Sequence, residues 1–173
     1  MHITPVDTEI KFSPDEIIVS KTDLKGRITY ANDVFCRVAE MKTADVIGKP
    51  HNIIRHPDMP RSVFKLLWET LHQEKEIFAY VKNMSATGKF YWVIAHVTPS
   101  WNAEGAVIGY HSNRRAPDTA MVREISKLYA DALAEENKHT NPKAAADAGY
   151  EFLNAKVQAA AENYDEFVWK MVA

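Results

Sequence analysis

The sequence has little of several features that mark other classes of protein. It has one cysteine, Cys36, among 173 residues, which excludes an internal disulfide and a multi-cysteine zinc or iron–sulfur site and suits a reducing cytoplasm. Its charges nearly balance, with 21 Lys and Arg against 23 Asp and Glu and a net charge of −2. Because there is no strong basic field, we do not expect a nucleic acid as partner.

Membrane-spanning and catalytic signatures are also missing. No apolar run approaches the roughly 18 residues that a membrane helix needs, and the N-terminal residues 1–5 do not form a signal peptide. There is no glycine-rich phosphate loop, no serine lies in a Gly-x-Ser-x-Gly context, and no histidine pair has a spacing for zinc on one helix face. We therefore expect a cytoplasmic protein that is not an enzyme and holds no metal.

The composition predicts one ordinary domain with a helical extension. Hydrophobic residues make up 46% of the chain, enough to fill a core. We expect a loosely held N-terminal cap over residues 1–16, anchored by Ile10 and Phe12, a compact domain over residues 17–116, and a helical region over residues 117–173.

The compact domain shows strands before and after a set of short helices. A hairpin is predicted at 17–19 and 27–30 around the turn Asp23-Leu24-Lys25-Gly26, and three more strands at 78–82, 90–98 and 106–111, with Pro99 ending the second of these. Asn32 and Thr43 are candidate caps of the short helices. The order predicts an α+β fold in which a five-stranded antiparallel sheet and helices on one face enclose a pocket.

One connector stands out chemically. His51-Asn52-Ile53-Ile54-Arg55-His56-Pro57-Asp58-Met59-Pro60 is stiffened by two prolines. It leads into a helix whose apolar face is predicted to consist of Val63, Phe64, Leu67, Trp68 and Leu71. Arginine and histidine near a helix N-terminus suit an anionic ligand such as a phosphate. The alternative is a solvated loop with a local pair between Arg55 and Asp58.

The order of elements resembles a PAS domain. The segments that carry this resemblance are Asp23–Asn32, Gly48-Lys49-Pro50 and Thr87–Trp92, and it spans residues 17–116. The connector, followed by Phe64 and Trp68, resembles the PAS domains of aerotaxis receptors. This resemblance implies non-covalently bound FAD and a role as a redox or oxygen sensor in energy taxis.

The resemblance assigns cofactor contacts to seven residues: Asn32, Arg55, His56, Asp58, Trp68, Asn83 and His111. Arg55 and His56 would face the pyrophosphate or ribose while Asp58 orients one of them. Asn32 and Trp68 have a structural alternative each, as a helix cap and as a core aromatic.

Two of the seven would lie near the flavin ring. Asn83 matches the asparagine that hydrogen-bonds the polar edge of the ring in flavin-binding PAS domains. His111 falls where light-sensing relatives carry glutamine, and its adjustable charge could sense a proton. Its alternative is a half-exposed strand histidine.

The sequence also allows functions other than an FAD sensor. Light-sensing flavin domains need a cysteine in the segment before the long helix, and none lies between His51 and Trp68, so no photoadduct is expected. A haem gas sensor could use His56, His72 or His111. A cofactor-free dimerisation module and, more weakly, a flavoenzyme are the remaining alternatives.

The tail is predicted to be helical. Pro117 opens a helix to about Asn137, and Asn141-Pro142 starts another. The second carries a stripe at alternating steps of four and three: Ala146, Tyr150, Leu153, Val157, Ala160, Tyr164, Phe167 and Met171. This stripe predicts either a homodimer or docking on a chemoreceptor-type partner, or a helix folded back on the domain. The polypeptide would be the sensor module of a receptor or a stand-alone PAS adaptor.

Overall fold

In a computed structural model, which describes the backbone of residues 3–172 and the side chains of residues 3–170, the chain forms a five-stranded antiparallel sheet. The strands are β1 (Ile18–Thr22), β2 (Ile28–Ala31), β3 (Ile77–Met84), β4 (Phe90–Trp101) and β5 (Val107–Arg115), in the spatial order β2-β1-β5-β4-β3. Residues 1, 2 and 173, which fall within the predicted N-terminal cap and helical tail, and the side chain of Met171 in the predicted stripe lie outside the described residues.

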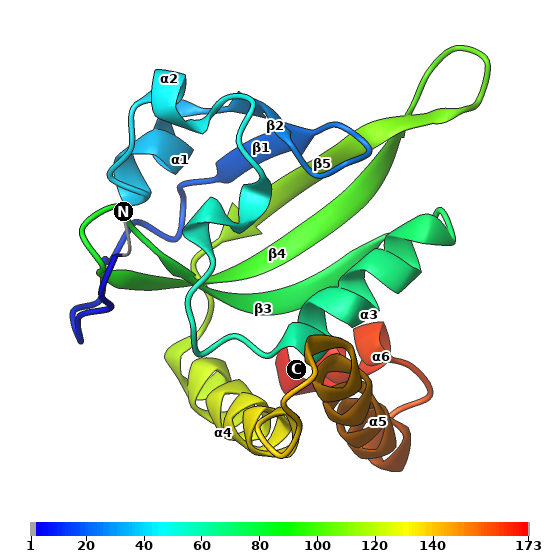
Figure 1. The fold of residues 1–173 in the computed structure, drawn as a ribbon. Helices are drawn as coiled ribbons and strands as arrows, with labels where there is room; N and C mark the ends of the chain where they lie inside the picture. Colours follow the sequence, from blue (N-terminus) through cyan, green and yellow to red (C-terminus); the bar gives the residue numbers. More distant parts are fainter. Residues whose placement is uncertain (1–2, 173) are drawn as a thin grey trace.

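Short helices and one longer helix cover one face of the sheet (Figure 1). They are α1 (Asp33–Val38), α2 (Thr43–Val46), the 3-10 helix η1 (His51–Ile54) and α3 (Arg61–His72). The helix α3 begins directly after Pro60, as its apolar periodicity predicts. This arrangement confirms the predicted α+β class, the sheet and the helical layer.

Two local predictions about the sheet are corrected. The strand β4 continues past Pro99, which pairs with Tyr110 of β5. On its other edge, β4 has no partner strand at Pro99, because β3 begins at Ile77 opposite Val97. The missing N–H of the proline therefore leaves no hydrogen bond of the sheet unmade. The N-terminal segment is held by the backbone of β4: Ile10 N donates to Phe90 O at 2.7 Å, and Phe90 N donates to Thr8 O at 2.9 Å. It is therefore better tethered than a loose cap.

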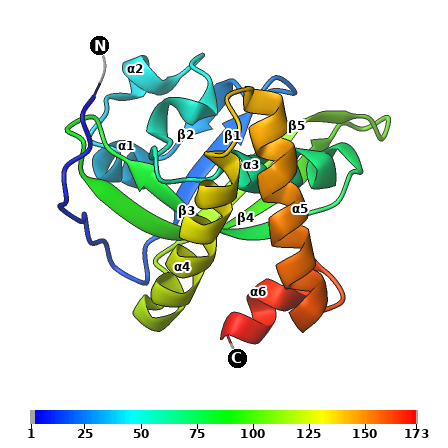
Figure 2. The same ribbon diagram turned by 60° about the horizontal axis from the view of Figure 1, so that its bottom comes forward.

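Three C-terminal helices gather at the β3 edge of the sheet (Figures 1 and 2). They are α4 (Thr119–Glu136), α5 (Pro142–Ala160) and α6 (Tyr164–Val172), and α4 and α5 form an antiparallel hairpin (Figure 2). On the outer face of the sheet, Tyr129 of α4 stacks on Trp92 with the ring centroids 6.4 Å apart. The helix α5 packs on α3, and α6 packs on β3.

The predicted continuous stripe of the tail is broken after Ala160. Ala161 is extended, and the side chain of Asn163 accepts a hydrogen bond from Glu166 N at 2.9 Å, which starts α6. Leu153, Val157 and Tyr164 of the stripe are buried within this chain, as the folded-back alternative expects. A homodimer through these helices stays a prediction. None of the helices within residues 3–172 combines the length and the hydropathy needed to span a bilayer.

Candidate functional site

A cavity of about 420 Å³ lies between the sheet and the helices η1 and α3. This volume is within the range of about 300–1,000 Å³ that is typical of small-molecule sites. Its lining comes from the turn after β1, from the connector, from α3 and from the inner face of β1, β3, β4 and β5. The predicted connector therefore does form one wall of an interior cavity.

The helix side of the cavity is apolar. Phe64, Leu67, Trp68 and Leu71 of α3 line it, because their spacing places them on the face of the helix that points at the sheet. Trp68 packs edge-to-face on Tyr110 with the ring centroids 5.4 Å apart. Gly26 adopts a positive φ of 73°, and a Cβ there would meet the Trp68 ring at 3.2 Å, so the turn closes tightly over the indole.

The sheet side of the cavity carries four polar atoms that have no hydrogen-bond partner: Thr22 Oγ1, Asn83 Nδ2, Ser112 Oγ and Arg114 Nη1. Among residues 3–170 these are all the buried side-chain polar atoms without a partner, and every one belongs to a cavity-lining residue. Such atoms are few in native structures, and each costs about 1–3 kcal/mol when nothing satisfies it. Their concentration on one wall indicates that this wall hydrogen-bonds to a ligand or to ordered water.

A buried cation is held at the end of this wall. Arg114 is 5% exposed, and its Nη2 donates to Ser20 Oγ at 2.9 Å and to His51 Nε2 at 2.6 Å. Burial and the nearby Arg114 charge lower the pKa of His51 to about 3, so its ring is neutral and Nε2 accepts. Burial lowers the pKa of Arg114 to about 10, which still leaves it protonated at neutral pH. The cavity therefore has one fixed positive charge on its sheet side.

Arg55 is one of the predicted ligand contacts that lie at the cavity. It lines the cavity, and its backbone forms an isolated antiparallel bridge with Asn83. Its Nη2 donates to Met59 O at 2.8 Å, and the guanidinium lies 4.3 Å from the centroid of the Phe64 ring. Burial lowers the pKa of Arg55, and a guanidinium in this setting keeps further donors for an anionic group.

His56 and Asp58 are not among the cavity-lining residues. His56 is 4% exposed, its Nδ1 accepts from Asp58 N at 3.1 Å, and its ring meets Phe90 edge-on. Asp58 faces solvent and accepts from Lys82 Nζ at 2.6 Å. Asp58 thus pairs with Lys82 and not with Arg55, and both residues shape the connector from outside the cavity.

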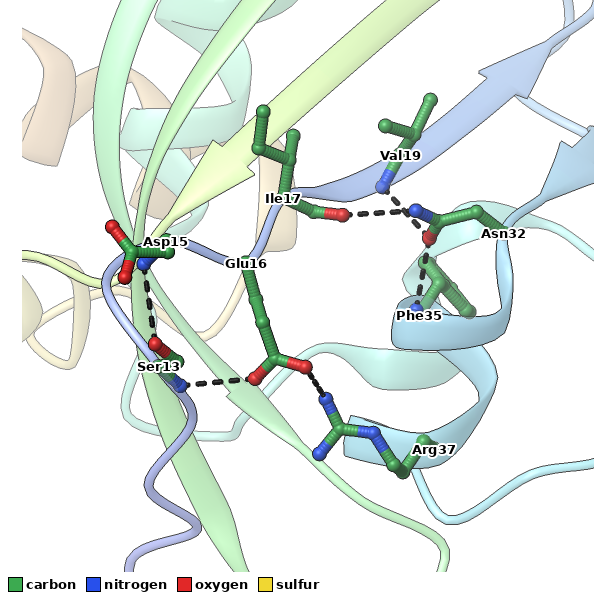
Figure 3. A network of polar contacts seen from close by, with 8 residues as sticks. All are labelled: Ser13, Asp15, Glu16, Ile17, Val19, Asn32, Phe35 and Arg37. Carbon is green, nitrogen blue, oxygen red and sulfur yellow. Dashed lines mark hydrogen bonds and ion pairs between the residues drawn. The ribbon is translucent and has the colours of Figure 1, made fainter.

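Asn32 takes the structural alternative (Figure 3). Its Oδ1 accepts from Phe35 N and from Val19 N, each at 3.0 Å, and its Nδ2 donates to Ile17 O at 2.8 Å. The amide therefore caps α1 and ties it to β1 and to the residue before it. The structure does not place Asn32 on the cavity wall.

His111 lies on the opposite face of β5 from the cavity. Tyr110, Ser112 and Arg114 line the cavity, and strand alternation turns His111 outward. There its Nε2 lies 3.0 Å from Asn113 Oδ1. The predicted contact of His111 with a flavin is corrected by this placement, because the strand itself separates the ring from the cavity.

Three of the seven predicted contacts, Arg55, Trp68 and Asn83, line the cavity. Four further lining residues were not among them: Thr22, His51, Ser112 and Arg114. The signal for two of these was available, since Ser112 and Arg114 share the register of Tyr110 on an otherwise apolar inner face. The side chains of residues 3–170 form no cluster of three His, Cys, Asp or Glu that could bind a metal ion.

Comparisons with known proteins agree with this geometry. A sequence model described as "PAS fold" matches residues 28–114. The aerotaxis receptor of Escherichia coli K12 is 35% identical over 128 residues, which are 74% of this chain and 25% of that protein. The nitrogen fixation regulatory protein of Klebsiella pneumoniae is 29% identical over 113 residues, 65% of this chain and 21% of that protein.

Solved structures show the same fold. One described as "Flavin Analogue Sheds Light on Light-Oxygen-Voltage Domain Mechanism" aligns with a TM-score of 0.57 and 16% identity, covering 71% of this chain and 87% of that one. A PAS domain from Colwellia psychrerythraea aligns with a TM-score of 0.54 and 16% identity over 58% of this chain and 86% of that one. The chain spans about a quarter of the aerotaxis receptor and about a fifth of the nitrogen fixation protein.

Proposed function

This chain belongs to the PAS-fold family, and on that premise we propose that it is a redox or oxygen sensor that binds FAD non-covalently in the cavity. In this proposal it signals to a chemoreceptor-type transducer through its C-terminal helices, and it is a binding and signalling protein with no catalytic reaction of its own. The observation that carries the proposal is the set of four unpartnered polar atoms on one wall of the cavity.

The two walls suit the two aspects of an isoalloxazine ring. A flavin has a flat apolar face and an edge rich in hydrogen-bond acceptors. The α3 wall offers Leu67 and Trp68 to the face, and the sheet offers the donors Asn83 Nδ2 and Arg114 Nη1 to the edge. When bound, a flavin supplies reversible uptake of electrons and protons.

The cavity volume suits the ring better than a whole dinucleotide. The exposed Lys25 and the half-buried Arg55 both line the cavity and are the cations available to a diphosphate. Where η1 meets the sheet, His51 of η1 is neutral at physiological pH and Arg114 of β5 is charged. A negative charge added to a ligand in the cavity would therefore be stabilised by Arg114, which is already charged, and not by protonation of His51.

Similarity to named relatives supports the same proposal. The similarity to an aerotaxis receptor favours energy sensing, and the fold shared with a domain studied with a flavin analogue favours a flavin. The haem alternative is less favoured, because His56, His72 and His111 do not line the cavity. The cofactor-free alternative is less favoured because side chains do not fill it.

The test is the absorbance spectrum of the freshly purified full chain, and of the chain after incubation with FAD. We expect the broad blue and near-ultraviolet bands of a flavin. In Arg55→Ala the flavin content should fall, whereas in His111→Gln, on the opposite face of the sheet, it should stay at the wild-type level. A sharp violet band would favour haem, and a colourless protein that takes up no FAD would refute the proposal.

A further inference from the structure

A buried carboxylate joins the C-terminal helices to the start of α3. Glu136, the last residue of α4, is only 4% exposed. Its Oε2 accepts from Arg61 N at 2.9 Å, and its Oε1 accepts from Ser62 N at 2.8 Å and from Ser62 Oγ at 2.7 Å. A carboxylate at a helix N-terminus is favoured by the helix dipole, and buried glutamates are rare without such partners.

The helix α5 closes over this contact. A Cβ at Gly149 of α5 would lie 2.7 Å from the Glu136 side chain and 2.8 Å from Ser62 Oγ, so no larger residue fits there without displacing the carboxylate. Nearby on the same pair of helices, Lys65 Nζ of α3 contacts Asp147 Oδ1 of α5 at 2.5 Å. The α4–α5 hairpin is therefore locked onto α3 around a buried acid.

The same end of α3 is reached from the cavity. Arg55 lines the cavity and donates to Met59 O at 2.8 Å, two residues before Arg61. Its guanidinium also covers the ring of Phe64, which is itself a cavity-lining residue of α3. Arg55 thus contacts both the cavity and the turn before α3, whose first residues donate hydrogen bonds to Glu136.

We propose that Glu136 is a latch that keeps the α4–α5 hairpin docked on α3, and that Arg55 couples the latch to the cavity. An anionic ligand group that engages Arg55 would order the turn at Met59 and strengthen the docked state, and a loss of that contact would release the hairpin. The identity of the ligand rests on the proposed function, but the latch and its coupling to Arg55 do not. Because such coupling is reciprocal, a ligand that favours the docked hairpin must bind the docked state more tightly than the released state by the same factor.

The latch is tested by amide hydrogen exchange on the full chain. In Glu136→Gln the amide group loses one acceptor oxygen, so the amides of Arg61 and of α4 and α5 should exchange about tenfold faster. The matched control is Glu135→Gln, since Glu135 pairs with Lys138 on the surface, and it should exchange like the wild type. Wild-type rates in Glu136→Gln would refute the latch.

The coupling is tested with and without FAD. Arg55→Lys keeps the positive charge but loses the guanidinium group that contacts both Met59 O and the cavity. Amide exchange in α4 and α5 should therefore be faster than in the wild type even without ligand. Unchanged exchange rates there would refute the coupling. If the wild type binds FAD, saturating ligand should slow this exchange, and Glu136→Gln should weaken FAD affinity by at most the factor by which the ligand slows it. If no FAD binds, the proposed function fails while the ligand-free comparison still decides the coupling.

Discussion

Asn83→Leu is the substitution that isolates the polar wall of the cavity. Asn83 is 4% exposed, and its Nδ2 has no hydrogen-bond partner, so leucine of similar size removes a donor without breaking a bond inside the protein. Asn83 lines the cavity of about 420 Å³, a volume that can hold ordered water. We therefore expect the free energy of unfolding of the ligand-free protein to change by less than about 1 kcal/mol.

The same substitution should also weaken ligand binding. If Asn83 Nδ2 donates to a flavin carbonyl, its loss removes one hydrogen bond with a net value of about 0.5–1.5 kcal/mol. Since about 1.4 kcal/mol is a factor of ten in affinity, the Kd for FAD should rise by up to about tenfold.

Two measurements check this expectation. Quenching of flavin fluorescence on titration with protein gives the Kd, and urea unfolding of the ligand-free protein gives its stability. His111→Gln is the control, because its side chain lies on the other face of the sheet. Equal FAD affinity in Asn83→Leu and wild type, or an equal loss in His111→Gln, would contradict the assignment of the ligand edge to this wall.

Three further outcomes follow from single groups. Asn32→Ala breaks three hydrogen bonds at the start of α1 and should lower the free energy of unfolding in urea by about 2–3 kcal/mol, a result that a change below about 0.5 kcal/mol would contradict. Hydrogen bonds from Lys89, Thr87 and Ser85 lower the pKa of Glu40 to about 2 from its ordinary 4.5. The stabilisation from Glu40 is thus complete above pH 4.5 and is lost as the pH falls toward 2, and Glu40→Gln should lose less stability than wild type between pH 7 and pH 3 in urea titrations. His51, whose pKa is lowered to about 3 by burial and by Arg114, should keep constant NMR ring shifts from pH 8 to pH 5. A titration near pH 6 would contradict its placement beside the charged Arg114.

The fold was accessible from the sequence because local signals agreed with one another. Alternating β-branched and aromatic residues gave the strands, Pro60 gave the start of α3, and the spacing of Phe64 and Trp68 gave its buried face. The break between α5 and α6 was missed, although Asn163 with Glu166 three residues later is a helix-start pattern. The break was missed because the apolar spacing of the stripe continues across it.

The site was only partly accessible for a geometric reason. Arg55, Trp68 and Asn83 were found from the motif that they share with a known family, but the sequence carries no direct sign of which strand face turns inward. His111 was predicted to face the cavity and Arg114 was not. Both errors have one cause, because a shift of one residue along a strand exchanges its inward and outward faces. The pairing of Glu136 with Ser62, 74 positions apart, depends on tertiary packing alone.

The packing of the C-terminal helices against the β3 edge also limits where the chain can be truncated or fused to another protein. Asp165 of α6 accepts from Phe78 N at 3.2 Å, and Tyr129 of α4 donates to Tyr80 O at 2.8 Å, so edge groups of β3 are satisfied by the tail. A fragment ending at Ala116 would uncover Trp92 and leave an open strand that templates intermolecular pairing. Chimaeras joined at that boundary should therefore aggregate more readily than chimaeras that keep the three C-terminal helices.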